Sequence, residues 1–385
     1  MEIIIAPDSF KESLTSLEVA NTIEAGFKEV FPNASYTKLP IADGGEGTVE
    51  ALIIATKGRV VTTNVIGPLG KKIESFYGIC GDGKTVVIEM AASSGLDLVP
   101  INDRNPLLTT SFGTGELILE ALNAGYRKFI IGIGGSATND AGAGMLQALG
   151  VKLLDKNKKN IAYGGSSLSQ LEAIDISGLD YRIKESHIEV ACDVNNPLTG
   201  LNGASAIFGP QKGATPDMVK RLDNCLVHFS NIVKRDLNKE IANQSGAGAA
   251  GGMGAALQGF LDAKLLPGVE IIIEQTKFKK LVQNATLVIT GEGRIDGQSI
   301  FGKAPVGIAK VAKEFDVPVI AIAGSLGNDV NVVKEYGIDA VFSVVNTPCT
   351  LNKALKDAVS NIHLTAKNIA EVIALNNKVK STCKF

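Results

Sequence analysis

The chain has few of the residues that metal sites and disulfide frameworks require. Five of its 385 residues are cysteines and three are histidines. The cysteines are odd in number, widely spaced and without a Cys-x-x-Cys pair, which indicates reduced thiols in a cytoplasmic protein. The histidines His187, His228 and His363 are scattered, so neither a zinc site nor a catalytic triad can be drawn through them.

Strong charge and long apolar runs are also missing. The net charge of −2 gives no long-range attraction for nucleic acid or for an anionic membrane surface. Residues 241–261 carry no charge, but six glycines and several amide and hydroxyl side chains make them too polar for a membrane span. The N-terminus begins with an apolar strand and has no basic region, so we expect no secretory signal and a soluble, cytoplasmic protein.

Two common kinase signatures are absent. The sequence contains no Gly-x-x-x-x-Gly-Lys-Ser/Thr string, which excludes a classical nucleotide P-loop. The motifs of protein kinases are missing as well. Any phosphoryl transfer by this chain must therefore use a different scaffold.

Strand and helix signals alternate near both chain ends. Residues 2–6 form a strand signal that is followed by the helix capping box Thr15…Glu18. The C-terminal third repeats this order with strands at 286–290 and 317–323 around a helix at 303–315, and an amphipathic helix is predicted at about 352–376. Such nearly continuous apolar strands are typical of a parallel sheet that helices cover on both faces.

The middle of the chain has a different pattern. Turn residues separate three β-rich segments, which predicts an antiparallel meander at 60–66, 73–80 and 84–90. Further α/β pieces follow, among them a helix predicted at 216–235 with one apolar stripe of Leu222, Leu226, Phe229 and Ile232. We therefore predict an α/β fold with two domains and a ligand cleft between them. These are a discontinuous Rossmann/flavodoxin-like domain (1–60 plus 281–385) and an inserted mixed α/β domain (61–280).

Six short loops share one composition, in which glycines and acids or a lone basic residue follow an apolar run. They are Pro7–Lys11, Asp43–Gly47, Gly134–Asp140, Cys192–Pro197, Gly209–Gly213 and Gly291–Gly297. Glycine lets backbone N–H groups approach a ligand, and carboxylates beside it can hold a divalent cation or take a proton. Together the six loops predict a site for a polyphosphate, its metal and a second substrate, as a small-molecule kinase requires.

The loop after residue 133 admits more than one interpretation. Gly132–Ala137 fits a dinucleotide-binding fingerprint, and an acid follows at Asp155. However, Thr138-Asn139-Asp140 places polar groups where a helix would pack on the sheet. We favour an anion site formed by backbone amides at the start of a helix over 139–149. A simple tight turn is the structural alternative.

Four basic residues lie in or beside glycine-bearing loops: Lys11, Lys212, Arg294 and Lys303. Each is a candidate to bind phosphate or carboxylate, although a solvated surface charge is the ordinary role of a lone lysine.

Three acids lie where open α/β sheets bind ligands: Asp43, Asp193 and Asp296. Asp193 stands beside Asn195 and Asn196, which indicates a base or metal ligand that amides orient. An Asx turn before Pro197 is the alternative. A separate segment, Gly246–Gly259, alternates glycine with alanine and predicts close helix packing, with ligand contact as the alternative.

In their order along the chain, these motifs resemble the type I glycerate kinases. The likeness covers essentially the whole chain. It is carried by Ile5–Lys11, Ile41–Thr48, Ile133–Gly142, Ala191–Leu198, Gly246–Gly254, Thr290–Asp296 and Gly302–Pro305.

The resemblance implies ATP-dependent phosphorylation of D-glycerate with Mg²⁺, on a two-domain α/β fold unrelated to P-loop and protein kinases. Bacterial members are associated with 2-phosphoglycerate, which favours the 2-hydroxyl as the acceptor. We expect direct in-line transfer in which Arg294 or Lys11 holds the substrate carboxylate and Asp193 takes the hydroxyl proton.

The remaining expected roles concern the metal and the nucleotide. Asp43 and Asp296 would orient Mg²⁺ or the substrate diol. We expect Asp43 to be a catalytic residue as well. The residues expected to bind substrate or ATP are Asp8, Ser9, Gly44, Gly45, Gly134, Gly135, Ser136, Thr138, Asn139, Lys212, Glu292 and Lys303.

Two other functions are the alternatives to a kinase: an NAD-dependent dehydrogenase of a small hydroxy acid and a non-catalytic organic-acid-binding protein. We expect no nucleic-acid or membrane partner, and a homodimer is possible.

Overall fold

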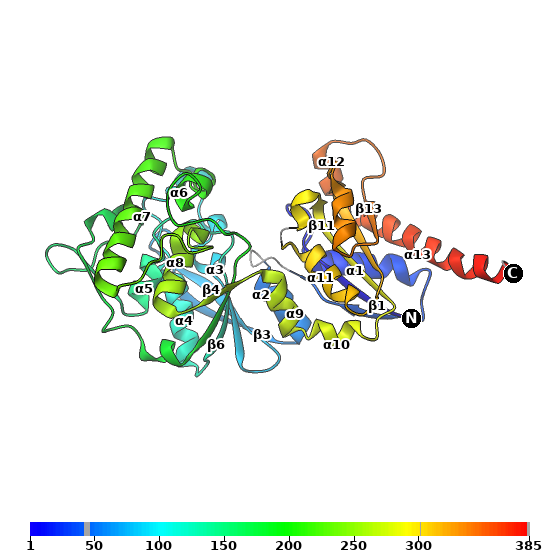
Figure 1. Cartoon of the computed structure of the whole chain (residues 1–385), viewed down its shortest axis with the longest axis horizontal. Helices are drawn as coiled ribbons and strands as arrows, with labels where there is room; N and C mark the ends of the chain where they lie inside the picture. The colour runs from blue at the N-terminus through cyan, green and yellow to red at the C-terminus, as the bar shows by residue number, and fades with distance from the viewer. Residues whose placement is uncertain (42–46, 301, 383–385) are drawn as a thin grey trace. The chain divides into compact units, whose positions relative to one another are not determined.

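The computed structural model describes residues 1–41, 47–300 and 302–382 (Figure 1). The chain forms two compact units, each with its own sheet and its own core. Unit 1 comprises Met1–Asp43, Glu50–Thr56 and Val269–Phe385, and unit 2 comprises Gly44–Val49 and Lys57–Gly268. The predicted boundaries of the two domains stay a prediction.

Unit 1 contains a five-stranded sheet in the order β13-β12-β11-β1-β2. All pairs are parallel. The strands are β1 (Glu2–Pro7), β2 (Ser35–Lys38), β11 (Leu287–Ile295), β12 (Val319–Leu326) and β13 (Ala340–Ser343). From β1 the chain adds β2 on one side of the sheet, and it later adds β11, β12 and β13 on the other side of β1. This strand order is flavodoxin-like, and its direction reverses between β1 and β11. Ligands of open α/β sheets bind beyond the carboxyl ends of the strands at such a reversal.

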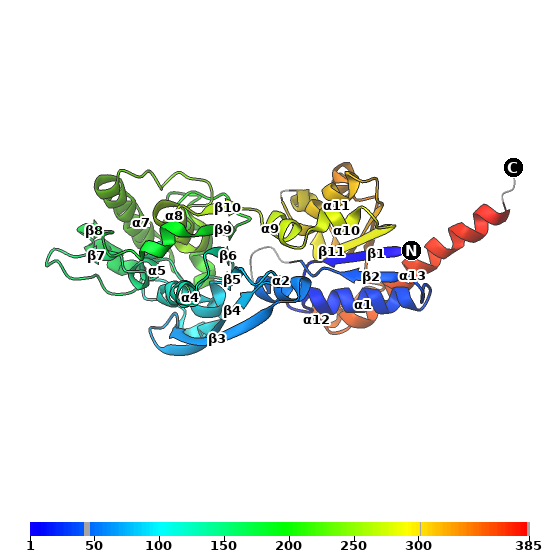
Figure 2. The same ribbon diagram turned by 90° about the horizontal axis from the view of Figure 1, so that it is seen from below.

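Helices cover both faces of this sheet (Figure 2). They are α1 (Ser16–Lys28), α9 (Gly268–Gln275), α10 (Phe278–Val282), α11 (Ala304–Lys313), α12 (Leu351–Lys356) and α13 (Ala358–Thr382), while α2 (Thr48–Thr56) is divided between the units. The predicted capping box begins α1, because the Thr15 side chain accepts from Glu18 N and the Glu18 carboxylate accepts from Thr15 N. Ile23 and Phe27 of α1 are buried in a core shared with α13.

Two expectations for unit 1 need correction. The predicted helix at about 352–376 is two helices, α12 and α13. The strand predicted at 286–290 continues as β11 to Ile295, through residues that were expected to form a loop. The reason is that β12 continues beside it, pairing Glu292 with Ala323 and Arg294 with Ser325. The pairing with β1 ends at Gly291, so the last four residues of β11 project beyond β1.

Unit 2 contains a six-stranded mixed sheet in the order β10-β9-β6-β5-β4-β3. The strands are β3 (Arg59–Ile66), β4 (Lys72–Ile79), β5 (Thr85–Glu89), β6 (Lys128–Gly132), β9 (His187–Ala191) and β10 (Lys264–Leu266). The first three form the predicted antiparallel meander. The other pairs are parallel, so β5, β6, β9 and β10 end at the same edge. A separate antiparallel pair joins β7 (Lys152–Leu154) to β8 (Ala173–Asp175).

The helices of unit 2 pack around this sheet. They are α3 (Ala91–Ser94), α4 (Phe112–Asn123), α5 (Ala143–Ala148), α6 (Ala204–Phe208), α7 (Pro216–Leu237) and α8 (Ala249–Leu261). The predicted apolar stripe of α7 is confirmed, since Leu222, Leu226, Phe229 and Ile232 are all buried. Phe229 stacks against Phe260 of α8, with ring centroids 6.3 Å apart.

The glycine- and alanine-rich segment packs closely, as predicted. A Cβ atom on Gly254 would lie 2.1 Å from the carbonyl oxygen of Gly246. Three successive residues, Ala250, Gly251 and Gly252, have φ angles of 52°, 67° and 94°. This left-handed turn contacts the loop after β6, because the N–H of Ala141 donates to the Gly251 carbonyl at 3.0 Å.

In the ranges that the structure describes, no helix combines the length and apolarity that a membrane span requires. In the same ranges, Cys192, Cys225 and Cys349 are free thiols.

Candidate functional site

The strand reversal in unit 1 places polar groups just beyond β1. Asp8 follows the strand directly, and its N–H donates to the Gly291 carbonyl of β11 at 2.8 Å. The Asp8 carboxylate accepts from the N–H of Ser9 at 2.6 Å and is largely buried. Lys11 lies in the same turn and is exposed. The first predicted loop therefore lies at the edge where this sheet would bind a ligand.

The projecting end of β11 carries a buried acid. Glu292 accepts from Ser299 Oγ at 2.6 Å and from Lys303 Nζ at 3.0 Å. Burial raises the pKa of Glu292, while Ser299 and Lys303 act in the opposite direction by stabilising its carboxylate. Lys303 is the residue that precedes α11, and its side chain is partly exposed. The structure thus joins two predicted ATP-binding residues, Glu292 and Lys303, in one ion pair.

Arg294 and Asp296 form a second ion pair beside the first. Arg294 Nε donates to Asp296 Oδ2 at 3.0 Å, and Gln298 N donates to Asp296 Oδ1 at 3.0 Å. The Arg294 side chain is 67% exposed, whereas that of Asp296 is 17% exposed. Among the described residues, the guanidinium is hydrogen-bonded only through Nε. Its outer N–H groups are therefore presented to solvent and can meet an anionic ligand.

Three predicted residues of the second loop, Asp43, Gly44 and Gly45, lie outside the described residues. The predicted roles of these residues stay predictions.

In unit 2, the loop after β6 divides into an exposed and a buried part. Gly134 is half-buried and Gly135 is exposed with a φ angle of 71°. Ser136, Thr138 and Asn139 are buried. The loop is fixed to the chain before it, since the Gly135 carbonyl accepts from Leu96 N and Ala137 N donates to the Ser94 carbonyl. Only the two glycines are placed to touch a ligand through their backbone.

Asp140, the last residue of this loop, holds it to the protein interior through its carboxylate. It is fully buried, and it accepts from both the N–H and the hydroxyl of Ser111 and from the N–H groups of Gly142 and Gly144. Burial raises the pKa of Asp140, and these donors oppose that shift. The predicted helix over 139–149 is corrected to α5, which begins at Ala143. Its first amides bind Asp140 and Ser111, so they are not open to a phosphate.

Lys212 is buried beside the same loop. Its side chain is 1% exposed, and Nζ donates to Ser136 Oγ and to the Thr138 carbonyl, both at 2.7 Å. Burial lowers the pKa of the amine to about 7, although the charge of Asp140 acts to raise it. The partners of this predicted ATP-binding residue are thus internal.

Asp193 lies at the same edge of the sheet, two residues after β9. Its Oδ1 accepts from the N–H of Gly268 at 3.0 Å, and the residue as a whole is exposed. The neighbouring Cys192 is half-buried, and burial raises the pKa of its thiol. Asp193 is therefore hydrogen-bonded to a backbone amide in an exposed position at this edge of the sheet.

The dinucleotide-binding interpretation of the loop after β6 does not fit the structure. In a dinucleotide-binding fold, the acid that binds the ribose lies at the end of a second strand. This strand neighbours the first strand in the same parallel sheet. Asp155 instead follows β7, which belongs to the separate two-stranded sheet, and its carboxylate accepts from the N–H groups of Asn157 and Lys159 in a turn.

Sequence reasoning missed one buried acid at this edge, Glu89, whereas the other buried polar atoms here belong to two predicted residues, Thr138 and Asn139. Glu89 ends β5, is 5% exposed and accepts from the N–H of Val49 at 2.6 Å. A lone acid at the end of a buried apolar strand was the available signal. Thr138 Oγ1 and Asn139 Oδ1 are buried without a partner among the described residues. Unpaired buried polar atoms are rare and tend to mark functional or strained regions.

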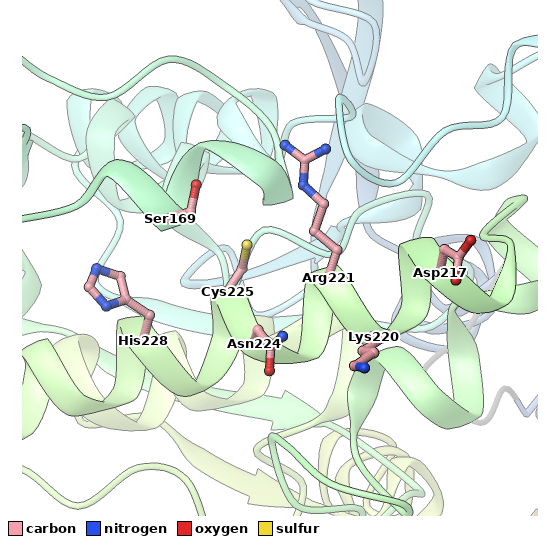
Figure 3. Close-up of a pocket in the computed structure, with 7 residues that line it drawn as sticks. All are labelled: Ser169, Asp217, Lys220, Arg221, Asn224, Cys225 and His228. Atoms are coloured by element: carbon pink, nitrogen blue, oxygen red, sulfur yellow. The ribbon is translucent and has the colours of Figure 1, made fainter.

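A surface hollow of about 460 Å³ lies elsewhere in unit 2, along α7 (Figure 3). Its lining residues are Ser169, Asp217, Lys220, Arg221, Asn224, Cys225 and His228. None of them is a predicted site residue or ends a strand. In Figure 3 the Arg221 and Lys220 side chains point in different directions, so they do not converge on one ligand.

An open parallel sheet with paired acids and bases beyond its strand ends is the arrangement of an α/β enzyme that acts on small anionic ligands. Comparison with known proteins identifies the enzyme class. The family model described as the glycerate kinase family matches residues 3–374.

Similar proteins match along nearly their whole length. A glycerate kinase from Haemophilus influenzae is 58% identical over 374 residues, which cover 97% of this chain and 99% of the relative. A glycerate 2-kinase from Escherichia coli is 58% identical over 375 residues, 97% of this chain and 98% of the relative. A crystal structure described as glycerate kinase 2 from Salmonella typhimurium LT2 is 56% identical, covers 98% of this chain and 99% of that one, and has a TM-score of 0.88.

The chain belongs to the glycerate kinase family, and it is a kinase. The resemblance of its motifs and the α/β fold are thereby confirmed.

Proposed function

We propose that this kinase transfers the γ-phosphoryl group of ATP to the 2-hydroxyl of D-glycerate and forms 2-phosphoglycerate. The observation that carries the proposal is the 58% identity, along 97% of this chain, to the Escherichia coli protein named glycerate 2-kinase. The edges of the two sheets support it chemically, because they present the cations and carboxylates that a charged acid and a polyphosphate need.

Arg294 is the proposed ligand of the substrate carboxylate. Its guanidinium is held by Asp296 through Nε and is 67% exposed. A planar guanidinium can bind a small carboxylate with two parallel hydrogen bonds. Lys11 is the second candidate, and Asp8 and Ser9 in the same turn would bind the substrate or the nucleotide beside it.

Asp193 is the proposed acceptor of the hydroxyl proton. Its anchored carboxylate can be held in one orientation by Gly268 N while the exposed part of the group meets the substrate. Correct placement of such a base is typically worth a factor of about 10²–10⁴ in rate.

The half-buried Gly134 and the exposed Gly135 are the proposed backbone contacts to ATP phosphates, and Lys303 is a proposed cation that binds the same phosphates. A glycine backbone allows phosphate oxygens to approach the amide N–H groups closely. Gly44 and Gly45 keep their proposed role in binding.

Mg²⁺ is proposed to accompany ATP. Within the described ranges, no group of three His, Cys, Asp or Glu side chains is arranged as a metal site. Mg²⁺ bound with a nucleotide usually needs only one or two protein carboxylates and takes its other ligands from phosphate and water. Asp296 fits this demand, since each of its oxygens accepts one hydrogen bond and keeps a lone pair. Asp43 is the proposed second carboxylate. The ion would neutralise phosphate charge.

The test is a coupled ADP-release assay with D-glycerate, L-glycerate, glycolate and lactate, followed by ³¹P NMR of the product. We expect ADP release with D-glycerate to exceed that with the other acids, and the phosphorus resonance of 2-phosphoglycerate. A resonance of 3-phosphoglycerate would overturn the acceptor position. Absence of ADP release with every acid would overturn the proposed reaction.

A further inference from the structure

The amine of Lys212 has no path to a ligand, yet it contacts two residues of the loop after β6. The side chain is 1% exposed, and Nζ donates to the Ser136 hydroxyl and to the Thr138 carbonyl, both at 2.7 Å. These partners precede the lysine by 76 and 74 residues. A buried amine with such distant partners fixes the position of the loop relative to the chain segment that carries the lysine.

The segment that carries Lys212 is itself held in place. A short 3₁₀ helix spans Pro210–Lys212, and Gly213 follows it with a φ angle of 91°. A Cβ atom on Gly213 would lie 2.4 Å from the carbonyl oxygen of Arg104. The close contact with Arg104 restricts the backbone next to Lys212. The position of the lysine side chain is therefore well fixed.

The loop has a second internal support and one exposed end. Asp140 binds Ser111 and the first amides of α5, while Gly134 and Gly135 remain at the surface. Lys212 bonds to the residues between these two regions. Its hydrogen bonds therefore help to hold the part of the loop that follows Gly134 and Gly135.

We propose that Lys212 is a positioning residue for nucleotide binding: its buried amine joins Ser136 to Thr138 and thereby holds Gly134 and Gly135 in the geometry that receives phosphate. This inference rests on the proposed function, because it takes these glycines to contact ATP. Lys212 itself does not touch the nucleotide.

The experiment uses the full chain with Lys212→Met, Ser136→Ala and the double variant. The dissociation constant of ATP is measured by calorimetry, together with kcat and the KM values of ATP and D-glycerate. Because two buried hydrogen bonds are lost, we expect Lys212→Met to weaken ATP binding about tenfold. The KM of D-glycerate should change less than about twofold, and the double variant should resemble Lys212→Met because both residues act through one contact.

Lys220→Met is the matched control. It removes an exposed lysine in the same unit that is not part of the proposed machinery, and it should leave ATP affinity unchanged. Hydrogen exchange of the peptide covering residues 133–140 is the readout that does not depend on catalysis. In Lys212→Met this peptide should exchange at least tenfold faster, with little change in β3 and β4.

The outcomes separate the two proposals. A Lys212→Met variant that is less stable but binds ATP normally, with unchanged exchange in this loop, would overturn the positioning role. If that variant does not fold, Ser136→Ala decides, since normal ATP affinity and normal loop exchange in it would overturn the role equally. If the wild type neither binds nor consumes ATP, the proposed function fails, while the exchange of the loop still tests whether Lys212 holds it.

Discussion

At the scale of single residues, Asp193 is fixed by a backbone contact and is the proposed acceptor of the hydroxyl proton. One carboxylate oxygen accepts the N–H of Gly268 at 3.0 Å, and the residue lies exposed after β9. An asparagine at this position keeps an oxygen acceptor for that N–H group but cannot take a proton. The substitution therefore separates the structural role of the side chain from its proposed chemistry.

We expect Asp193→Asn to lower kcat by at least about a hundredfold, because a positioned base is lost. The circular dichroism spectrum and the unfolding midpoint should stay close to those of the wild type. Steady-state kinetics measures the effect, and Asp217→Asn on the exposed face of α7 is the control. Near-normal turnover of Asp193→Asn would refute the assignment of the base.

The lowered pKa of Lys212 predicts how the free energy of unfolding depends on pH. Its pKa falls from 10.5 to about 7 on burial, so between these values the unfolded chain holds a proton that the folded protein lacks. The free energy of unfolding therefore rises with pH in this window, by up to about 1.4 kcal/mol per pH unit. Below about pH 7 both states are protonated, and the contribution levels off.

Urea unfolding of wild type and Lys212→Met between pH 6 and 9.5 measures this contribution as a difference. The wild type should gain stability relative to the variant above about pH 7. Lys220→Met should follow the wild type throughout. Parallel curves for wild type and Lys212→Met would show that the amine keeps an ordinary pKa.

At the scale of elements, the left-handed turn at the start of α8 supports the loop after β6. Gly251 has a φ angle of 67°, and its carbonyl accepts from Ala141 N. A Cβ atom there would lie 2.0 Å from the Thr138 carbonyl oxygen, which also accepts from Lys212. The turn and the lysine thus contact the same peptide group from two elements.

Gly251→Ala should lower the free energy of unfolding by at least about 2 kcal/mol, since it adds a backbone clash to a strained φ angle. Gly70→Ala is the matched control, because its φ angle is 74° and a Cβ atom there meets nothing within 4 Å. That control should lose only about 1 kcal/mol. Urea unfolding compares the two variants, and equal losses would mean that the contact with Thr138 can relax.

At the scale of the whole molecule, each unit has a separate hydrophobic core. Phe27 of α1 belongs to the core of unit 1, and Phe229 of α7 belongs to that of unit 2. Both side chains are fully buried. Separate cores favour separate cooperative units of unfolding.

Phe27→Ala should destabilise unit 1 by about 3–5 kcal/mol, and Phe229→Ala should do the same for unit 2. Hydrogen exchange read by peptide distinguishes them. Phe27→Ala should accelerate exchange in β1 and β11 and spare β6 and β9, while Phe229→Ala should give the reverse. Uniform acceleration in both variants would indicate one cooperative unit, contrary to the predicted division into domains.

Much of the architecture was open to prediction from local patterns. The capping box Thr15…Glu18, the apolar stripe of α7 and the antiparallel meander all depend on residues close together in the sequence, and all three are confirmed. The glycine-bearing loops also identified the family, because their order is specific even where each loop alone is not.

By itself, then, the sequence determined many of the strands and helices and which family the chain belongs to, because those properties follow from short-range order. Tertiary structure alone decided that β11 runs on to Ile295, that Asp140 caps α5 from within, and that the Lys212 amine is internal. Each of these depends on a partner distant in the chain, such as Ser136 for Lys212, and backbone pairing and burial arise only when the fold brings such segments together.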